Sequence, residues 1–148
     1  MAISPISPQI REEVSARFDQ LIEALETHPQ WSGPPNPNPS LYFVWDFANR
    51  SKYMISEYDN IASGRPVQHP NQFRPAPGSG EAAAVKVFQE ACGRTMMVEL
   101  IVNDTSGRMA MMTGSSGPPL DYGERVKQAV ADLDKAIPDE HKMAGMLG

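Results

Sequence analysis

Apolar residues near the start of the chain recur every three or four positions, the spacing that predicts a helix. Between residues 8 and 27 they form one stripe, with charged residues beside it. Ser7 can accept hydrogen bonds from the first exposed N–H groups. Pro8 suits the first helical position because it has no N–H to leave unpaired. We therefore predict a helix over 8–27.

Two further segments have the same helical period. In 81–92 the apolar stripe is preceded by Ser79, a candidate cap, and followed by Gly93, a residue type that commonly ends helices. In 121–137 the stripe is followed by Pro138, which cannot continue a helix. We predict a helix over each segment.

Other segments are rich in aromatic and branched residues and alternate between two faces, which predicts β-strands. Residues 48–51 are then the turn of a first hairpin. In the second hairpin, the turn is the sequence Asn-Asp-Thr-Ser-Gly at 103–107. The four predicted strands cover 41–47, 52–58, 95–102 and 108–113.

These elements together predict an α+β fold. The two β-hairpins form one antiparallel sheet with helices packed on one face, in the order α-β-β-α-β-β-α. We expect a single domain over 1–138 and a loose C-terminal tail over 139–148. The proline-rich connection 61–80 is unusually long, and two interpretations stay open for it: a binding loop or a poorly ordered excursion.

Composition and charge narrow the class of protein. The chain has 148 residues, a formal net charge of −5 and a single cysteine, Cys92. Nucleic-acid binding usually needs a basic face, so a nucleic-acid partner is not expected. No segment has the roughly 20 apolar residues of a membrane span, and residues 1–9 lack the features of a secretory signal. We expect a cytoplasmic protein without membrane contact.

The common patterns of catalytic and metal-binding residues are missing from the sequence. For Cys92, a buried structural role is preferred to a catalytic pair with His69. The histidines are isolated and no phosphate-binding glycine loop is present, so neither a metal site nor a cofactor is expected. An enzyme with a cleft over the sheet, using Asp46, Tyr58 or His69, stays open as the alternative.

Methionine and tyrosine residues form the candidate binding surface. Methionines gather in the second predicted hairpin, and methionine both fills irregular cores and forms adaptable binding surfaces. The tyrosines of the first hairpin, with Trp31, could form the kind of aromatic patch that anchors interfaces. A core role stays open for both groups. The residues assigned to partner binding are Tyr42, Tyr53, Tyr58, Met97, Met109, Met111 and Met112.

Four segments carry a resemblance to a known family: Leu-Tyr-Phe-Val-Trp (41–45), Lys-Tyr-Met-Ile-Ser (52–56), Phe-Gln-Glu-Ala (88–91) and Val-Glu-Leu-Ile-Val-Asn-Asp-Thr-Ser-Gly-Arg (98–108). Their order resembles that of the YezG-like toxin-immunity proteins, which have an N-terminal helix, an aromatic strand pair, a helix and a hairpin. The chain is also similar to class I type III secretion chaperones, which are small, acidic and α+β. Neither resemblance assigns a functional residue.

The leading hypothesis is a non-enzymatic protein that neutralises or escorts one specific protein partner. Resemblance to immunity proteins implies a toxin as that partner, and resemblance to secretion chaperones implies a secreted effector. Pairing of the chain with a second copy of itself is an alternative assembly.

Overall fold

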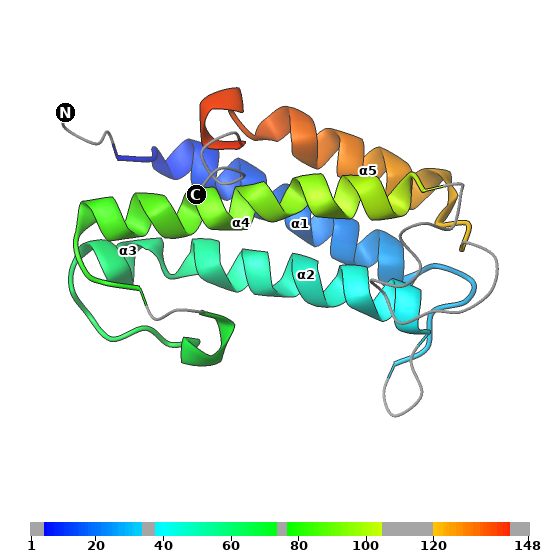
Figure 1. Ribbon diagram of the computed structural model, residues 1–148, viewed down its shortest axis with the longest axis horizontal. Coiled ribbons are helices and arrows are strands. Elements are labelled where there is room, and N and C mark those ends of the chain that lie inside the picture. Colours follow the sequence, from blue (N-terminus) through cyan, green and yellow to red (C-terminus); the bar gives the residue numbers. More distant parts are fainter. Residues whose placement is uncertain (1–4, 34–37, 74–76, 105–119, 143–148) are drawn as a thin grey trace.

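The computed structural model describes residues 5–33, 38–73, 77–104 and 120–142, which fold into four long helices and two short ones (Figure 1). The long helices α1 and α4 run in one direction, and α2 and α5 run in the other. Each long helix packs against two antiparallel neighbours, which makes an up-down-up-down four-helix bundle. The elements are α1 (Pro8–Glu26), α2 (Pro39–Ser56), α3 (Tyr58–Ala62), the 3₁₀ turn η1 (Pro70–Gln72), α4 (Glu81–Val102) and α5 (Gly123–Ala136).

The predicted α+β fold is wrong, because the residues that the structure describes contain no strand. The predicted strand 41–47 and the predicted turn 48–51 both lie within α2. The predicted strand 52–58 spans the end of α2 and the start of α3, and the predicted strand 95–102 is the second half of α4. The fourth predicted strand, 108–113, lies outside the described residues.

Helix α2 forms because a helical stripe of small and aliphatic residues overrides the alternating pattern. Asn38 begins the helix: its side-chain oxygen accepts hydrogen bonds from the N–H groups of Ser40 and Leu41, at 3.0 and 3.2 Å. No glycine or proline interrupts the chain between residues 40 and 63. The buried residues recur at helical spacing and are Ser40, Leu41, Val44, Ala48, Ser51, Met54 and Ile55.

Helix α4 continues past its predicted end at Cys92 and reaches Val102. Gly93, predicted to end the helix, lies inside it at a cost of about 1 kcal/mol relative to alanine. The following turns bury Val98 and Ile101 at helical spacing. Burying one such side chain contributes roughly 1.5–3 kcal/mol, which exceeds the cost of the glycine.

The two terminal helices predicted from the sequence are confirmed. At the start of α1, Ser7 Oγ accepts a hydrogen bond from Ile10 N at 3.2 Å, and Pro8 occupies the first position. Helix α5 begins at Gly123 rather than at residue 121. Asp121 Oδ1 accepts a hydrogen bond from Gly123 N at 2.9 Å.

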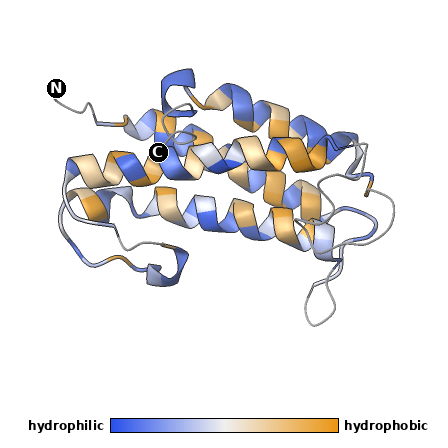
Figure 2. Ribbon diagram, viewed as in Figure 1, coloured by the Kyte–Doolittle hydropathy of each residue, from blue (hydrophilic) through white to orange (hydrophobic). Residues whose placement is uncertain are grey.

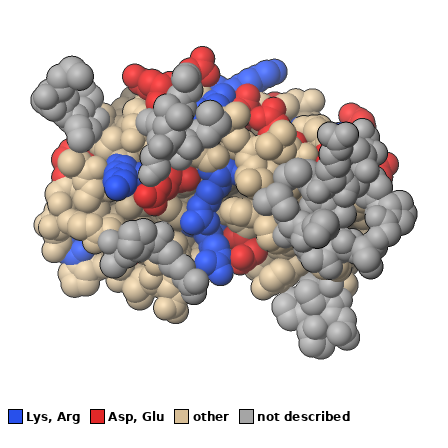
Figure 3. Space-filling model, viewed as in Figure 1, with Lys and Arg blue, Asp and Glu red and all other residues tan. Residues whose placement is uncertain are grey.

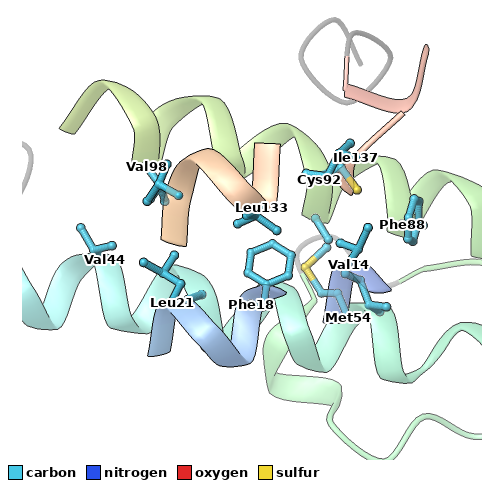
Figure 4. Close-up of a cluster of buried hydrophobic side chains, with 14 of the residues drawn as sticks. Val14, Phe18, Leu21, Val44, Met54, Phe88, Cys92, Val98, Leu133 and Ile137 are labelled. Atoms are coloured by element: carbon cyan, nitrogen blue, oxygen red, sulfur yellow. The ribbon is translucent and has the colours of Figure 1, made fainter. Parts of the chain in front are cut away.

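The core of the bundle is apolar and receives side chains from all four long helices (Figure 4). Apolar residues recur along each helix with hydrophilic residues between them (Figure 2). Within the described residues, no helix has both the length and the apolar character needed to cross a membrane. The close-up labels Val14, Phe18, Leu21, Val44, Met54, Phe88, Cys92, Val98, Leu133 and Ile137, which point toward one another.

The long connection 61–80 is fastened to the bundle. Gly80 N donates a hydrogen bond to Ile61 O at 2.8 Å, which brings the two ends of the connection together. The predicted cap Ser79 is not used: Gly80 takes the N-cap position of α4 with φ +99°, a conformation that favours glycine. Phe73, within the connection, is buried in the core.

The hydroxyl of Tyr58 connects three segments of the chain at one end of the bundle. It accepts a hydrogen bond from Ile6 N at 2.9 Å and donates one to Glu81 Oε1 at 2.5 Å. The guanidinium of Arg11 lies over the Tyr58 ring, 4.2 Å from its centre. Burial, followed by the bond to Glu81, raises the pKa of Tyr58, so the hydroxyl keeps its proton and remains a donor.

The segment predicted as a loose tail, 139–148, is described only as far as Lys142. Lys142 Nζ lies 2.9 Å from Asp134 Oδ1 on α5. The ring of His141 packs edge-on against Phe88 on α4, with 5.7 Å between the ring centres. The described part of this segment is thus held against α4 and α5.

Glu57 is a buried carboxylate between α2 and α3, and its side chain is 1% exposed. Its oxygens accept hydrogen bonds from Asn60 Nδ2 at 2.8 Å and His69 N at 2.6 Å, and His69 Nδ1 lies 3.4 Å away. Burial raises the pKa of Glu57. The hydrogen bonds from Asn60, His69 and Gln68 lower it by more, so the pKa lies below its ordinary value of 4.5.

We predict that Glu57→Gln destabilises the protein at pH 7 by about 1.5–3 kcal/mol, because the amide nitrogen opposes the N–H donor of His69. A lowered pKa stabilises the fold above the unfolded value, and this contribution is lost as pH falls through the folded value. The difference between Glu57→Gln and the wild type, measured by urea unfolding, is therefore largest at pH 7 and shrinks below pH 4.5. Glu12→Gln, at an exposed position, is the control. An equal effect of the two substitutions would contradict the assignment.

The thiol of Cys92 is fully buried in the core, and this burial raises its pKa to about 12. We predict that a thiol-reactive dye does not label the native protein at pH 8 and labels it fully in urea. In the native state, the labelling rate follows global unfolding, because the thiol reaches solvent only when the core opens. Rapid stoichiometric labelling of the native protein would show that Cys92 is accessible.

Candidate functional site

Helix α2 carries five aromatic residues, and none of them is fully buried. Its buried positions are instead small or aliphatic. The core takes phenylalanine rings from the neighbouring helices, Phe18 from α1 and Phe88 from α4. In α2 the large rings are at most partly buried, and Phe43, Trp45 and Phe47 pack against the margin of the core. We call these five residues the aromatic face of α2: Tyr42, Phe43, Trp45, Phe47 and Tyr53.

One edge of the aromatic face lies beside the connection between α1 and α2. Tyr42 stacks on Trp45 with 5.4 Å between ring centres, and Trp31 from the connection lies against Trp45 at 5.8 Å. Within the described residues, the buried indole N–H of Trp45 has no hydrogen-bond acceptor. Trp N–H groups usually find a partner when buried. Ring contacts, rather than hydrogen bonds, thus hold this side chain.

The opposite edge of the aromatic face lies toward α4. Phe43 and Phe47 pack edge to face, with 5.0 Å between ring centres. Arg94 reaches from α4 so that its guanidinium carbon lies 5.8 Å from the centre of the Phe47 ring. Between the two edges α2 presents polar groups, including Arg50, whose Nε lies 2.9 Å from Asp46 Oδ2.

Tyr53 connects the aromatic face to the 61–80 connection. Its ring stacks on His69 with 4.4 Å between ring centres, and it is 36% exposed. His69 is held in turn by Glu57 through its backbone N–H. The far end of the aromatic face is therefore positioned by a buried carboxylate.

The electrostatics of this face are set by two neighbouring arginines. Basic side chains form a short line over α4 and α2, the helices that carry Arg94 and Arg50, with acidic side chains beside it (Figure 3). Burial, and next the charge of Arg50, lower the pKa of Arg94, while Glu90 and Asp46 act in the opposite direction. Arginine stays charged at neutral pH, so two like charges meet here.

The structure places the residues predicted for partner binding in different surroundings. Tyr42 and Tyr53 belong to the aromatic face. Tyr58 is buried, and Met97 is half-buried on α4 against the core. Met109, Met111 and Met112 lie outside the described residues.

The sequence interpretation missed Phe43, Trp45, Phe47, Arg50 and Arg94 as members of a candidate site. It assigned the three aromatic residues to a sheet. Helical spacing of the small and aliphatic residues at 41, 44, 48, 51 and 55 is the signal that would have separated these rings from the core.

A hollow of about 420 Å³ lies between the end of α1 and the start of α5. Both ring nitrogens of His28 are engaged there: Nδ1 accepts a hydrogen bond from Gln30 N at 3.0 Å, and Nε2 lies 2.9 Å from Asp121 O. With Nδ1 accepting, Nε2 carries the proton and donates to Asp121. The histidine in this hollow therefore ties two loops together.

The residues of the enzyme alternative have separate partners. Asp46 pairs with Arg50, Tyr58 binds Glu81, and His69 lies against Tyr53 and Glu57. Cys92 is a free cysteine buried in the core. Across the ranges that the structure describes, no three His, Cys, Asp or Glu side chains are grouped so that they could hold a metal ion.

Comparison with protein-family models, with curated proteins and with solved structures finds no match to this chain.

Proposed function

We propose that this chain is a non-enzymatic protein that binds one specific protein partner through the aromatic face of α2. The observation that carries the proposal is that five aromatic residues of one helix are left partly exposed at the margin of the core. Partly exposed rings of this kind are enriched at protein interfaces, where they supply a large contact area at a low entropic cost. The polar groups between the two edges can supply hydrogen bonds to the same partner.

The partners and burial of the candidate catalytic groups favour a binding protein over the enzyme alternative. Asp46 is neutralised by Arg50, Tyr58 is buried with its hydroxyl engaged, and the thiol of Cys92 has a raised pKa. Nucleophilic and acid–base catalysis need such groups to converge on a substrate, whereas Asp46 and Tyr58 contact different partners. The aromatic face needs no such convergence in order to bind.

Neutralising a toxin and escorting a secreted effector are the two forms of this function that we propose, both in the cytoplasm. Protein binding through the aromatic face does not depend on either family resemblance, whereas the toxin and effector forms come from those resemblances. The segments 41–45 and 52–56 that suggested a strand pair belong to a helix. The identity of the partner separates the two forms. Pairing of two copies of this chain through the same face is the alternative.

We predict that the double substitution Tyr42→Ala/Tyr53→Ala reduces partner binding by about tenfold or more, because removing an interface aromatic commonly costs more than 1.4 kcal/mol. The measurement is quantitative recovery of partners from the source cells on the tagged full chain. Leu100→Ala, which removes an apolar residue 60% exposed on α4, is the control and should recover as much partner as the wild type.

Two results would count against this proposal. One is the absence of any stoichiometric partner on the wild-type chain, together with a monomeric mass in solution. The other is equal recovery on all three chains. A dimeric mass that becomes monomeric in the double variant would instead assign the face to self-association.

A further inference from the structure

Arg94 is a half-buried cation with no bound acceptor. Its guanidinium lies over the Phe47 ring at 5.8 Å. Within residues 5–33, 38–73, 77–104 and 120–142, no carboxylate or carbonyl oxygen forms an ion pair or hydrogen bond with the Arg94 side chain. Its guanidinium N–H donors therefore remain available to an acceptor from outside the chain, although the side chain as a whole is half-buried.

The groups around Arg94 increase its need for an anion. Arg50, a like charge that acts on Arg94, already binds Asp46 at 2.9 Å, so that carboxylate is shared with another cation. Glu90 attracts Arg94 electrostatically without forming an ion pair with it. A carboxylate arriving from outside would satisfy the free donors and relieve the repulsion between the two guanidinium groups.

We infer that Arg94, together with Phe43 and Phe47, receives an acidic side chain of the protein partner and an apolar side chain beside it. The inference rests on the proposed function and adds the chemistry of the bound segment. The carboxylate binds the Arg94 guanidinium, and the neighbouring apolar side chain packs on the two phenylalanine rings.

Charge complementarity selects a single carboxylate rather than a polyanion. Asp46 and Glu90 lie beside the two arginines, and the chain as a whole carries −5, so a segment with many negative charges would be repelled. A partner that is otherwise neutral or basic, with one Asp or Glu next to an aromatic or aliphatic residue, fits both the local and the global charge. The occupant is therefore a protein segment and not a nucleic acid.

The test uses a display library of random 16-residue peptides selected on the purified full chain. The selected peptides are then measured by fluorescence anisotropy. We expect the selected sequences to be enriched in Asp or Glu directly beside an aromatic or branched apolar residue. Replacing that acid by its amide, or making Arg94→Gln, should each weaken binding by about tenfold or more. The two changes together should weaken binding little more than either one alone.

Two matched variants distinguish a specific loss of peptide binding from a loss of folding. Lys86→Gln removes a charge from an exposed position on the same helix and should leave binding unchanged. Arg94→Lys keeps the charge without the planar fork, and should bind more tightly than Arg94→Gln. Circular dichroism and the thermal midpoint confirm that each variant is folded.

The outcomes separate this inference from the proposed function. Selected peptides that lose affinity with Tyr42→Ala/Tyr53→Ala but show no acidic enrichment and no response to Arg94→Gln would overturn the inference and leave the function standing. Equal losses from Lys86→Gln and Arg94→Gln would also overturn it, because a general charge effect would explain both. Failure to select any peptide would overturn the inference, and recovery of a protein partner on the full chain would still decide the proposed function.

Discussion

Each long helix of this chain has one apolar stripe, and the four stripes can leave water only by packing against one another. Most of the stability of a helix in a protein comes from packing its apolar side, so these helices of 14 to 22 residues depend on the shared core. The surface contacts depend on it in turn. Lys52 on α2 pairs with Asp19 on α1, and Gln20 on α1 donates to Asp132 near α5's end, only because the core sets those helices side by side.

The packing of this core also determines which side chains remain available to contact another molecule. Helices α1 and α4 fill it with Phe18 and Phe88, while α2 contributes small and aliphatic side chains. A well-packed interior matches large groups with small ones. The aromatic residues of α2 consequently flank the core, where they can support both the fold and a contact with another molecule.

The fold was predictable from the sequence where a single periodicity was present. In α1 the apolar stripe, the Ser7 cap and Pro8 all agree, and the predicted helix is found. In α2 two patterns coincide: residues 41, 43, 45 and 47 alternate, while residues 41, 44, 48 and 51 follow helical spacing. Branched and aromatic residues favoured the strand, and tertiary packing chose the helix. The predicted end of the helix at Gly93 was wrong for the same reason. Burial of the following turns stabilises the helix by more than the glycine destabilises it.

The candidate site was only partly predictable, for a different reason. Tyr42 and Tyr53 are recognisable as interface residues from their type. The arrangement of Arg94 over Phe47 joins residues on two helices, and the coupling of Arg94 to Arg50 exists only after α2 and α4 have packed. No local pattern in the sequence encodes either contact.

The hydroxyl of Tyr58 has a consequence for how the molecule opens. One oxygen atom joins Ile6, at the beginning of the chain, to Glu81, at the start of α4. Moving any one of these segments away breaks a hydrogen bond of the Tyr58 hydroxyl, the group through which the other segments are also connected. This end of the bundle should therefore behave as one cooperative unit in which fraying of the N-terminus, loosening of α3 and unwinding of the first turn of α4 are a single event.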